Sequence, residues 1–254
     1  MKEKLAIFDV DYTLTKRETL VEFYFFMMRK NPKLLKYLPK SIYSSIFYVL
    51  KRHDASTLKK IFIRFIDGIE ENEMKKIVKE FYEKRLSKIL YKDAIVTIKK
   101  MKAEGYKIYL ISASAEFYLR ELYKIVEVDK VIGTRFTTEN GLHRNEIIGE
   151  NCKGEEKVKR LMEVLKKENI EVDFASSYMF SDSLSDLPLF NLVGHPFLIN
   201  FKKKHDKIKD EFWDLIHGGG PPKTATFDPF LTIFDPYLAP FWTPQKDTKI
   251  KAEF

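Results

Sequence analysis

The chain has 254 residues, of which 44% are hydrophobic and 32% charged, so it is long enough to bury a substantial core, as folded soluble domains do. Its single cysteine, Cys152, excludes an internal disulfide framework and a multi-cysteine zinc site, and it fits a reducing cytoplasm. The net charge of +8 favours an anionic partner, but lysine and glutamate are interleaved along the chain without a nucleic-acid recognition motif. We therefore expect an anionic small substrate rather than nucleic acid.

The first predicted element is a buried strand over residues 5–10. It is a short apolar run between charged residues, which is typical of a strand in a parallel sheet. A secretory signal would need a longer uncharged segment at this place, so we expect none and predict a cytoplasmic protein.

The interval from residue 15 to 92 has an almost entirely helical pattern, which interrupts the alternation of strands and helices. This placement predicts an inserted helical cap. Its aromatic-rich runs cover residues 23–28, 42–43 and 46–50. None of them approaches the ~20 apolar residues of a membrane-spanning helix. Packing of the cap against the core accounts for these side chains, and the alternative is an apolar surface for a lipid-like substrate or for peripheral membrane contact.

Strand and helix patterns alternate after residue 92, which predicts an α/β fold with a mainly parallel sheet. The further strands are predicted at residues 107–111, 131–133, 177–180 and 196–201. The helices between them are predicted at residues 95–103, 116–125, 155–167 and 187–193. Asparagine and glycine at positions 140 and 141 predict a small hairpin, flanked by residues 135–137 and 146–148.

A Gly-Gly-Gly-Pro-Pro cluster at residues 218–222 predicts the end of the folded domain. Beyond it, the motif Phe-Asp-Pro-aromatic-Leu occurs twice, and its prolines oppose a continuous helix. A tail that packs on the body, a partner or a membrane, a disordered tail and a non-native extension all remain open. The predicted division is a core of residues 1–15 and 93–217, a cap of residues 16–92 and a tail of residues 218–254.

The strongest chemical signal is the pair Asp9 and Asp11, at the carboxyl end of the first predicted strand. Ligands of open α/β sheets bind outside this end of the strands, and alternation along a strand places positions i and i+2 on the same side. Two carboxylates there repel each other unless a cation or a shared proton compensates. The alternative interpretation is a solvated acidic turn.

Three later motifs favour a phosphate site. Ser112 ends the second strand, where its hydroxyl and the following amide at Ala113 can bind phosphate oxygens. Lys153 and Lys157 lie near the start of the helix before the third apolar run, and a lysine charge suits a phosphoryl group. Two more carboxylates follow that run, Asp182 and Asp186. Carboxylates together with a substrate phosphate are natural ligands of magnesium (Mg2+).

With these motifs in this order, the chain resembles the haloacid dehalogenase superfamily over residues 4–216. The sequence Asp-Val-Asp-Tyr-Thr-Leu from Asp9 matches the first motif of the superfamily, and Ser112 the second. A lysine within 153–157 would be the third motif, and Asp182 with Asp186 the fourth. The insert between the first two motifs is similar to subfamily IB, which contains phosphoserine phosphatase and relatives such as a phosphatidylglycerophosphate phosphatase. The resemblance implies a Rossmann-like core with an all-helical (C1-type) cap.

The resemblance also implies a mechanism, hydrolysis of a phosphate monoester through an aspartyl phosphate. Asp9 would be the nucleophile and Asp11 the general acid and base. The phosphoryl oxygens would be bound by Ser112 and a lysine, for which we favour Lys157 over Lys153. The expected metal-site residues are Asp9, Asp11 through its backbone carbonyl, Asp182 and, next to the metal, Asp186. The expected substrate contacts are Thr13, Glu18, Ser112 and Ala113.

The substrate is expected to be a small phosphorylated metabolite or a lipid head group. Glu18 lies where phosphoserine phosphatases place an acidic residue facing the substrate amine, but their cap arginine has no clear match, and Arg64 is the nearest candidate. Phosphoserine phosphatase therefore stays an alternative. A catalytically silent binding protein of the same fold is an alternative of another class. The oligomeric state and transfer to an acceptor other than water stay open.

Overall fold

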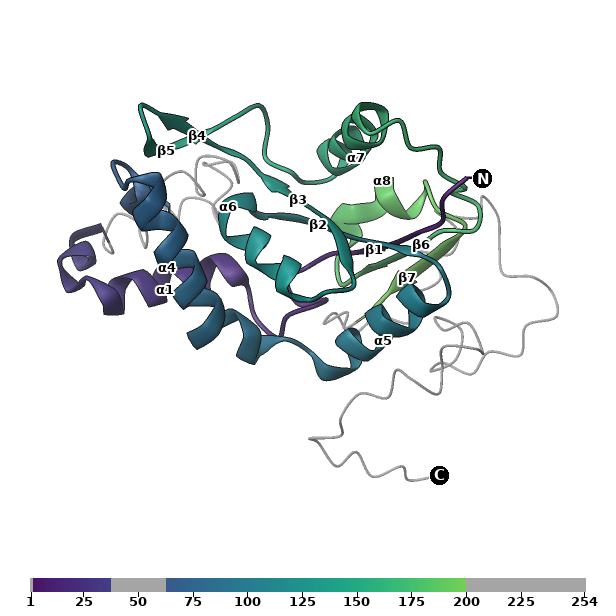
Figure 1. Ribbon diagram of the computed structural model, residues 1–254, viewed down its shortest axis with the longest axis horizontal. Coiled ribbons are helices and arrows are strands. Elements are labelled where there is room, and N and C mark those ends of the chain that lie inside the picture. Colours follow the sequence, from purple (N-terminus) through teal and green to yellow (C-terminus); the bar gives the residue numbers. More distant parts are fainter. Residues whose placement is uncertain (1, 38–62, 200–254) are drawn as a thin grey trace, which may run out of the picture.

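A five-stranded parallel sheet forms the centre of the protein, in a computed structural model that describes residues 2–37 and 63–199 (Figure 1). The strand order is β3-β2-β1-β6-β7. The strands are β1 (Leu5–Phe8), β2 (Lys107–Ala115), β3 (Val128–Thr134), β6 (Tyr178–Ser181) and β7 (His195–Leu198). The predicted mainly parallel α/β fold is therefore confirmed.

Strand β1 lies in the middle of this sheet and is buried on both faces. Its residues pair with β2, as Leu5 with Lys107, and with β6, as Ala6 with Tyr178. Ala6 and Phe8 belong to the hydrophobic cluster on one face, and Leu5 and Ile7 to the cluster on the other. A central parallel strand covered on both sides needs a continuous apolar sequence, which explains the run that predicted it.

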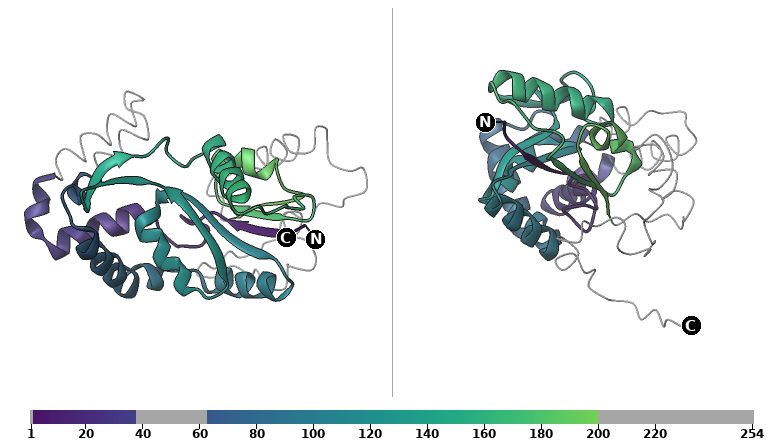
Figure 2. Two further views of the ribbon diagram at one scale, coloured as in Figure 1. Left: turned by 45° about the horizontal axis from the view of Figure 1, so that its top comes forward. Right: turned by 90° about the vertical axis from the view of Figure 1, so that its right-hand side faces the viewer.

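Helices cover both faces of the sheet (Figures 1 and 2). Side chains of α5 (Lys92–Ala103) and α6 (Glu116–Leu119) enter the cluster that contains Phe8. Side chains of α7 (Glu155–Lys167) and α8 (Leu187–Phe190) enter the cluster on the opposite face. This three-layer arrangement leaves the carboxyl ends of β1, β2 and β6 at one edge of the sheet.

The described part of the insert between β1 and β2 contains two helices, α1 (Thr19–Lys30) and α4 (Glu71–Lys84), and the short 3-10 helices Pro32–Tyr37, Arg64–Ile66 and Leu86–Ile89. Phe23 of α1 lies 5.0 Å from Phe81 of α4, between ring centroids, and 5.0 Å from Tyr118 of α6. Of residues 23–28, only Phe25 is exposed. In this region the aromatic side chains thus pack inward, as the packing interpretation requires.

Other sequence-based predictions for the insert and the tail lie outside the described residues. These are the aromatic runs at 42–43 and 46–50, the tail 218–254 and residues 200–201 of the last predicted strand. Within residues 2–37 and 63–199, no helix is both long and apolar enough to cross a membrane.

The predicted hairpin consists of β4 (Phe136–Glu139) and β5 (Leu142–Ile147), which pair antiparallel. Its turn residues Asn140 and Gly141 both have positive φ, 51° and 76°, the conformation that tight two-residue hairpin turns require. The hairpin also binds the insert. His143 donates its backbone N–H to Ile69 O (2.8 Å) and accepts from Gly68 N–H (2.9 Å).

Several predicted boundaries differ from the structure, and three of them are instructive. Strand β2 continues past residue 111 to Ala115, because its last residues still pair with β3 at Thr134 although several of them are polar. The helix predicted at 116–125 divides into α6 and a 3-10 helix, Arg120–Lys124. The helix predicted at 187–193 ends at Phe190. Hydrophobic periodicity does not detect any of these changes in backbone hydrogen bonding.

Candidate active site

Asp9 lies at the first position after β1, where the chain leaves the sheet. Its backbone N–H still bonds to Phe180 O of β6 (2.9 Å), so the residue is held at the edge of the sheet. Its side chain is buried, with 7% of the residue exposed. A carboxylate in such a place requires a compensating partner, because burial strongly disfavours its charged form.

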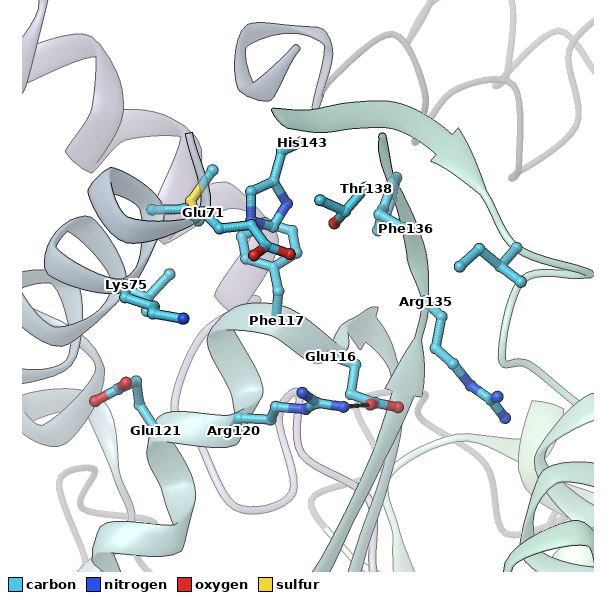
Figure 3. A pocket seen from close by; sticks show the side chains of 13 residues that line it. Glu71, Lys75, Glu116, Phe117, Arg120, Glu121, Arg135, Phe136, Thr138 and His143 are labelled. Carbon is cyan, nitrogen blue, oxygen red and sulfur yellow. Dashed lines mark hydrogen bonds and ion pairs between the residues drawn. The ribbon is translucent and has the colours of Figure 1, made fainter. Parts of the chain in front are cut away.

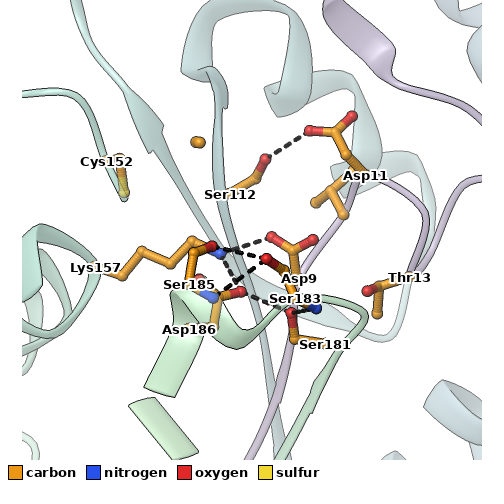
Figure 4. A network of polar contacts seen from close by, with 12 residues as sticks. Asp9, Asp11, Thr13, Ser112, Cys152, Lys157, Ser181, Ser183, Ser185 and Asp186 are labelled. Atoms are coloured by element: carbon orange, nitrogen blue, oxygen red, sulfur yellow. Dashed lines mark hydrogen bonds and ion pairs between the residues drawn. The ribbon is translucent and has the colours of Figure 1, made fainter. Parts of the chain in front are cut away.

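The partner is Lys157 on α7. Its Nζ lies 2.7 Å from Asp9 Oδ1 and 2.7 Å from Asp186 Oδ2 (Figure 4). Ser181 Oγ also donates to Asp186 Oδ2 over 2.7 Å. Lys157 and Asp186 are 2% and 1% exposed. One buried cation thus joins two buried carboxylates from β1 and from the turn after β6.

The electrostatics of this group are dominated by burial. Burial raises the pKa of Asp9 to about 8, with Asp186 and Asp11 raising it and Lys157 opposing the shift. Burial alone would lower the pKa of Lys157, but the charges of Asp9 and Asp186 outweigh it, so the net pKa is raised and the ammonium keeps its proton. The site therefore holds more negative charge than one lysine neutralises.

Asp11 lies on the other side of the site from Lys157. The chain turns sharply after Asp11 through Tyr12, which has a positive φ of 61°, and the amides of Leu14 and Thr15 bond back to Val10 O. Non-glycine residues adopt this conformation only when the surrounding structure stabilises it. Asp9 and Asp11 both line one pocket, as the alternation along the strand predicted.

Hydrogen bonds to both carboxylate oxygens fix the orientation of Asp11. Ser114 Oγ donates to Asp11 Oδ2 over 2.7 Å and Ser112 Oγ over 3.2 Å, while the backbone N–H of Thr19 donates to Oδ1 over 2.6 Å. Because Asp11 has partners on β2 and on α1, its side chain cannot turn freely within the site.

Asp182 follows β6 and completes the acidic rim. Its backbone N–H donates to Thr13 Oγ1 over 3.0 Å. Burial, together with the charges of Asp186 and Asp11, raises the pKa of the Asp182 carboxyl to about 6. Carboxylates that crowd one another in this way form a site that attracts a cation.

These groups surround a pocket of about 240 Å³. Its lining residues are Asp9, Asp11, Tyr12, Glu18, Leu20, Ala113, Ser114, Lys153, Lys157, Asp182, Ser183, Ser185 and Asp186. Most of the residues expected from the sequence are therefore brought together, including both candidate lysines. They differ in placement, because Lys157 is buried against Asp9 whereas Lys153 is exposed at the rim.

Two expected substrate contacts, Thr13 and Ser112, lie elsewhere. Both are fully buried and neither lines the pocket, since Thr13 supports Asp182 and Ser112 supports Asp11. Arg64, the nearest arginine candidate, is exposed and does not line the pocket either. The side chains at Thr13 and Ser112 thus act on the residues around the pocket rather than facing a molecule inside it.

The sequence interpretation overlooked several polar residues of the site. Ser114 binds Asp11 more closely than Ser112 does, and Ser181 binds Asp186. The signal for Ser114 was present, because Ser112 and Ser114 are two positions apart on one strand and so share a face. Ser183 and Ser185 line the pocket next to Asp186, but their hydroxyls bond to each other at 3.0 Å, a contact that spacing alone does not reveal.

The donor set fits magnesium, although within residues 2–37 and 63–199 no three carboxylate, imidazole or thiol side chains are grouped as a metal site by themselves. Asp9 and Asp182 with the backbone carbonyl of Asp11 offer hard oxygen ligands, and magnesium commonly completes such a set with water and phosphate oxygens. Asp186 Oδ1 is buried without a hydrogen-bond partner. A cation at this rim would offset the excess negative charge.

A second cavity of about 410 Å³ lies between the insert, α6 and the hairpin (Figure 3). Glu71 and Lys75 of α4, Phe117 of α6 and His143 of β5 are among its lining residues. Burial lowers the pKa of His143, partly opposed by the nearby charge of Glu71. None of the acidic residues at the first pocket reaches this cavity.

Comparison with known proteins shows the family and agrees with the fold. The haloacid dehalogenase-like hydrolase family matches residues 6–191. A probable phosphatase of Mycobacterium tuberculosis is 23% identical over 77% of this chain and 68% of its own length. A histidinol-phosphatase of Neisseria meningitidis is 22% identical over 85% of this chain and 99% of its own length.

Solved structures show the same fold. A Bordetella pertussis protein of unknown function has a TM-score of 0.69 at 20% identity and covers 78% of this chain and 90% of its own. A substrate-bound phosphoserine phosphatase has a TM-score of 0.54 at 18% identity, over 78% of this chain and 86% of its own. Because the family match spans most of the chain, the protein belongs to the haloacid dehalogenase-like hydrolases. It is an enzyme of the phosphatase type, as its phosphoserine phosphatase-like sequence indicated.

Proposed function

We propose that the protein is a magnesium-dependent phosphomonoester hydrolase that forms an aspartyl phosphate on Asp9. The observation that carries this proposal is the buried contact of Lys157 with both Asp9 and Asp186 at one side of a polar pocket, with Asp11 held in a fixed orientation at the other. A buried carboxylate paired with a lysine supports nucleophilic attack, and a second carboxylate across the pocket supports proton transfer.

In the first step, a carboxylate oxygen of Asp9 forms a bond to phosphorus while the bond from phosphorus to the leaving oxygen breaks. Lys157 binds Asp9 Oδ1, so we assign the attack to Oδ2. Asp11 gives its proton to the leaving oxygen. Lys157 offsets the charge on the phosphoryl oxygens, and Ala113 at the end of β2 lines the same pocket.

In the second step, water attacks the phosphorus of the aspartyl phosphate. Asp11 takes the proton of this water, the acyl phosphate bond breaks, and Asp9 is released as a carboxylate with inorganic phosphate as product. Magnesium, held by Asp9, Asp182 and the Asp11 carbonyl and oriented by Asp186, would supply positive charge next to the phosphoryl group.

The substrate that fits best is a small phosphorylated metabolite. The pocket of about 240 Å³ has room for a phosphoryl group and a short leaving group, and among the described residues its cations are lysines. A phosphorylated lipid head group is the other substrate class included in this proposal. Phosphoserine is the alternative that Glu18 favours, but no arginine of residues 2–37 or 63–199 lines the pocket to pair with its carboxylate.

The proposed organisation keeps a core of residues 1–15 and 93–217, a helical cap of residues 16–92 and a tail of residues 218–254, in a cytoplasmic protein. The described helices α1 and α4 support the helical nature of the cap. Glu18 and Leu20, at the start of α1, line the pocket and give the insert a direct contact with the site.

The test is hydrolysis of 4-nitrophenyl phosphate with magnesium or with a chelator, comparing wild type with Asp9→Asn. We expect turnover that needs magnesium and that the substitution abolishes, together with beryllium fluoride bound to Asp9 in the wild type alone. Beryllium fluoride mimics an aspartyl phosphate, so its binding reports the nucleophile even if the artificial substrate does not enter the pocket. If wild type shows neither turnover nor beryllium fluoride binding, a catalytically silent binding protein replaces this proposal.

A further inference from the structure

A line of buried hydroxyl groups leads from the Asp11 carboxylate into the protein. Ser114 Oγ donates to Asp11 Oδ2 over 2.7 Å, and Thr19 Oγ1 donates to Ser114 Oγ over 3.0 Å. The Tyr118 hydroxyl lies 3.3 Å from Thr19 Oγ1. Thr19 and Tyr118 are fully buried and Ser114 is 4% exposed, so bulk water does not compete for these bonds.

Because each hydroxyl has one proton, the donor and the acceptor of each hydrogen bond in this line can be assigned. Ser114 gives its proton to the carboxylate, which can only accept when ionised. Thr19 gives its proton to Ser114, so in the contact between Tyr118 and Thr19 the Tyr118 hydroxyl is the donor and Thr19 Oγ1 the acceptor. All donors therefore point toward Asp11, and each bond strengthens the next.

Three separate elements contribute to the line. Ser114 is on β2, Tyr118 is on α6, and Thr19 is the first residue of α1 in the insert. The Tyr118 ring is held between Phe23 of α1 and Phe81 of α4, with centroid distances of 5.0 and 5.8 Å. The packing of the insert on α6 is thereby connected to the position of the Asp11 carboxylate.

We infer that Tyr118 and Thr19 are positioning residues for Asp11, which orient its carboxylate toward the leaving oxygen through Ser114. This inference rests on the proposed function, because it requires Asp11 to protonate the leaving group. Neither side chain lines the pocket, so neither contacts the substrate. Without the Tyr118 proton, Thr19 and Ser114 can rotate to other acceptors, and Asp11 loses part of its orientation.

The effect of a misoriented Asp11 on the rate depends on how much the leaving group needs a proton. 4-Nitrophenolate is a weak base and leaves without protonation, whereas phenolate is a stronger base that benefits from a general acid. The two phosphate esters are otherwise close in size and shape. The ratio of kcat/KM for phenyl phosphate to kcat/KM for 4-nitrophenyl phosphate therefore reports proton transfer. A general defect of the pocket lowers both values equally and leaves this ratio unchanged.

The experiment measures kcat/KM of the magnesium-loaded enzyme for phenyl phosphate and 4-nitrophenyl phosphate in wild type and Tyr118→Phe. We expect kcat/KM for phenyl phosphate to fall about 10-fold, a fraction of the full general-acid effect, with little change for 4-nitrophenyl phosphate. Thr19→Val, which removes the hydroxyl but keeps the backbone N–H to Asp11, should show the same selective loss. It also serves as the second variant if Tyr118→Phe does not fold.

Tyr109→Phe is the matched control. Tyr109 is a buried tyrosine of β2 that belongs to the hydrophobic cluster on the opposite face, so its substitution should leave the ratio of the two substrates unchanged. Equal losses on both substrates in Tyr118→Phe would show a merely structural role and overturn the inference. So would unchanged activity on both.

Two further variants separate this inference from the proposed function. In an Asp11→Asn background, Tyr118→Phe should have no additional effect on the ratio, because the group that it positions is gone. Asp9→Asn should abolish hydrolysis of both esters. Activity that survives Asp9→Asn contradicts the proposed function itself, whereas loss in Asp9→Asn with an unchanged ratio in Tyr118→Phe contradicts only the positioning role.

Discussion

Among the described residues, Lys157 is the only cation that forms ion pairs with the buried Asp9 and Asp186. Removing one member of a buried ion pair leaves an uncompensated charge in a medium that solvates it poorly. The stability of the folded site and the ionisation of Asp9 therefore depend on this one ammonium.

We expect Lys157→Met to lower the free energy of unfolding by about 3–5 kcal/mol at pH 8, because two carboxylates stay buried without a cation. Burial raises the pKa of Asp9 above its ordinary value, so the folded state binds more protons than the unfolded chain, and the loss should shrink as the pH falls toward 4. Urea unfolding across this pH range measures both effects. The matched variant is Lys153→Met, whose exposed ammonium predicts a change within about 0.5 kcal/mol. A larger effect at Lys153 would assign the structural lysine to that position instead.

Whereas Lys157→Met should destabilise the protein, a substitution at Asp182 should stabilise the metal-free protein. Its pKa of about 6 lies above the ordinary value of 3.8, so without metal the folded state loses stability as the pH rises from about 4 through 6. Asp182→Asn should therefore be more stable than wild type at pH 7.5 by about 1 kcal/mol, a value that allows for partial exposure. The gain should vanish near pH 4.

With magnesium bound, wild type should become more stable than Asp182→Asn. Thermal unfolding with and without magnesium chloride should show a rise in Tm for wild type that is mostly lost in Asp182→Asn, because the ion binds only the folded state and needs this carboxylate. An equal rise in both proteins would place the ion away from Asp182.

At the scale of elements, the hairpin β4–β5 ties the insert to the core. Besides the two bonds of His143, Glu71 donates its backbone N–H to Gly141 O over 2.9 Å. Glu71 is the first residue of α4, so its N–H has no partner within the helix. The hairpin thus satisfies a backbone group that the helix itself leaves open.

Glu71→Pro tests this bond. Proline is well tolerated at the first position of a helix, and Glu70 already has the extended backbone that proline demands of its predecessor, so the substitution removes the N–H without breaking α4. We expect a loss of about 1 kcal/mol relative to Glu71→Ala, which removes the same side chain but keeps the bond. Hydrogen exchange at the amides of Gly68 and His143 should become faster in the proline variant alone. Equal stability of the two variants would show that the bond contributes nothing.

The sequence predicted elements well where local pattern decides them. Helix α7 has the predicted bounds, because its apolar face and its flanking residues are all local. Strand β2 was predicted too short, because its carboxyl end is held by pairing with β3 rather than by hydrophobic side chains. The hairpin turn was visible as Asn140-Gly141, but its bonds to residues 68–71 join segments that no periodicity connects.

For the candidate site, the sequence located the strand ends and hence Asp9, Asp11, Asp182 and Asp186 around one pocket. It favoured Lys157 without excluding Lys153, and the contact of Lys157 Nζ with Asp9 Oδ1 distinguishes the two in the structure. The hydroxyl line to Tyr118 was not foreseen, because it depends on how α1 and α6 pack in three dimensions.

At the scale of the whole molecule, the pocket joins distant parts of the chain: Asp9 and Asp11 follow β1, whereas Lys157, Asp182 and Asp186 come from the second half of the chain. The separation is a result of the strand order, in which β1 lies between β2 and β6. This strand order is that of an α/β fold with a parallel sheet.

The central position of β1 also matters while the protein is being made. A ribosome releases residues 5–8 first, yet their two neighbours in the sheet are synthesised only at residues 107–115 and 178–181. Until then β1 has unpaired backbone groups on both edges and apolar side chains on both faces, a combination that promotes aggregation. Nascent chains that stop before residue 178 should therefore need protection by chaperones, and the complete sheet can form only after residues 195–198 have been synthesised.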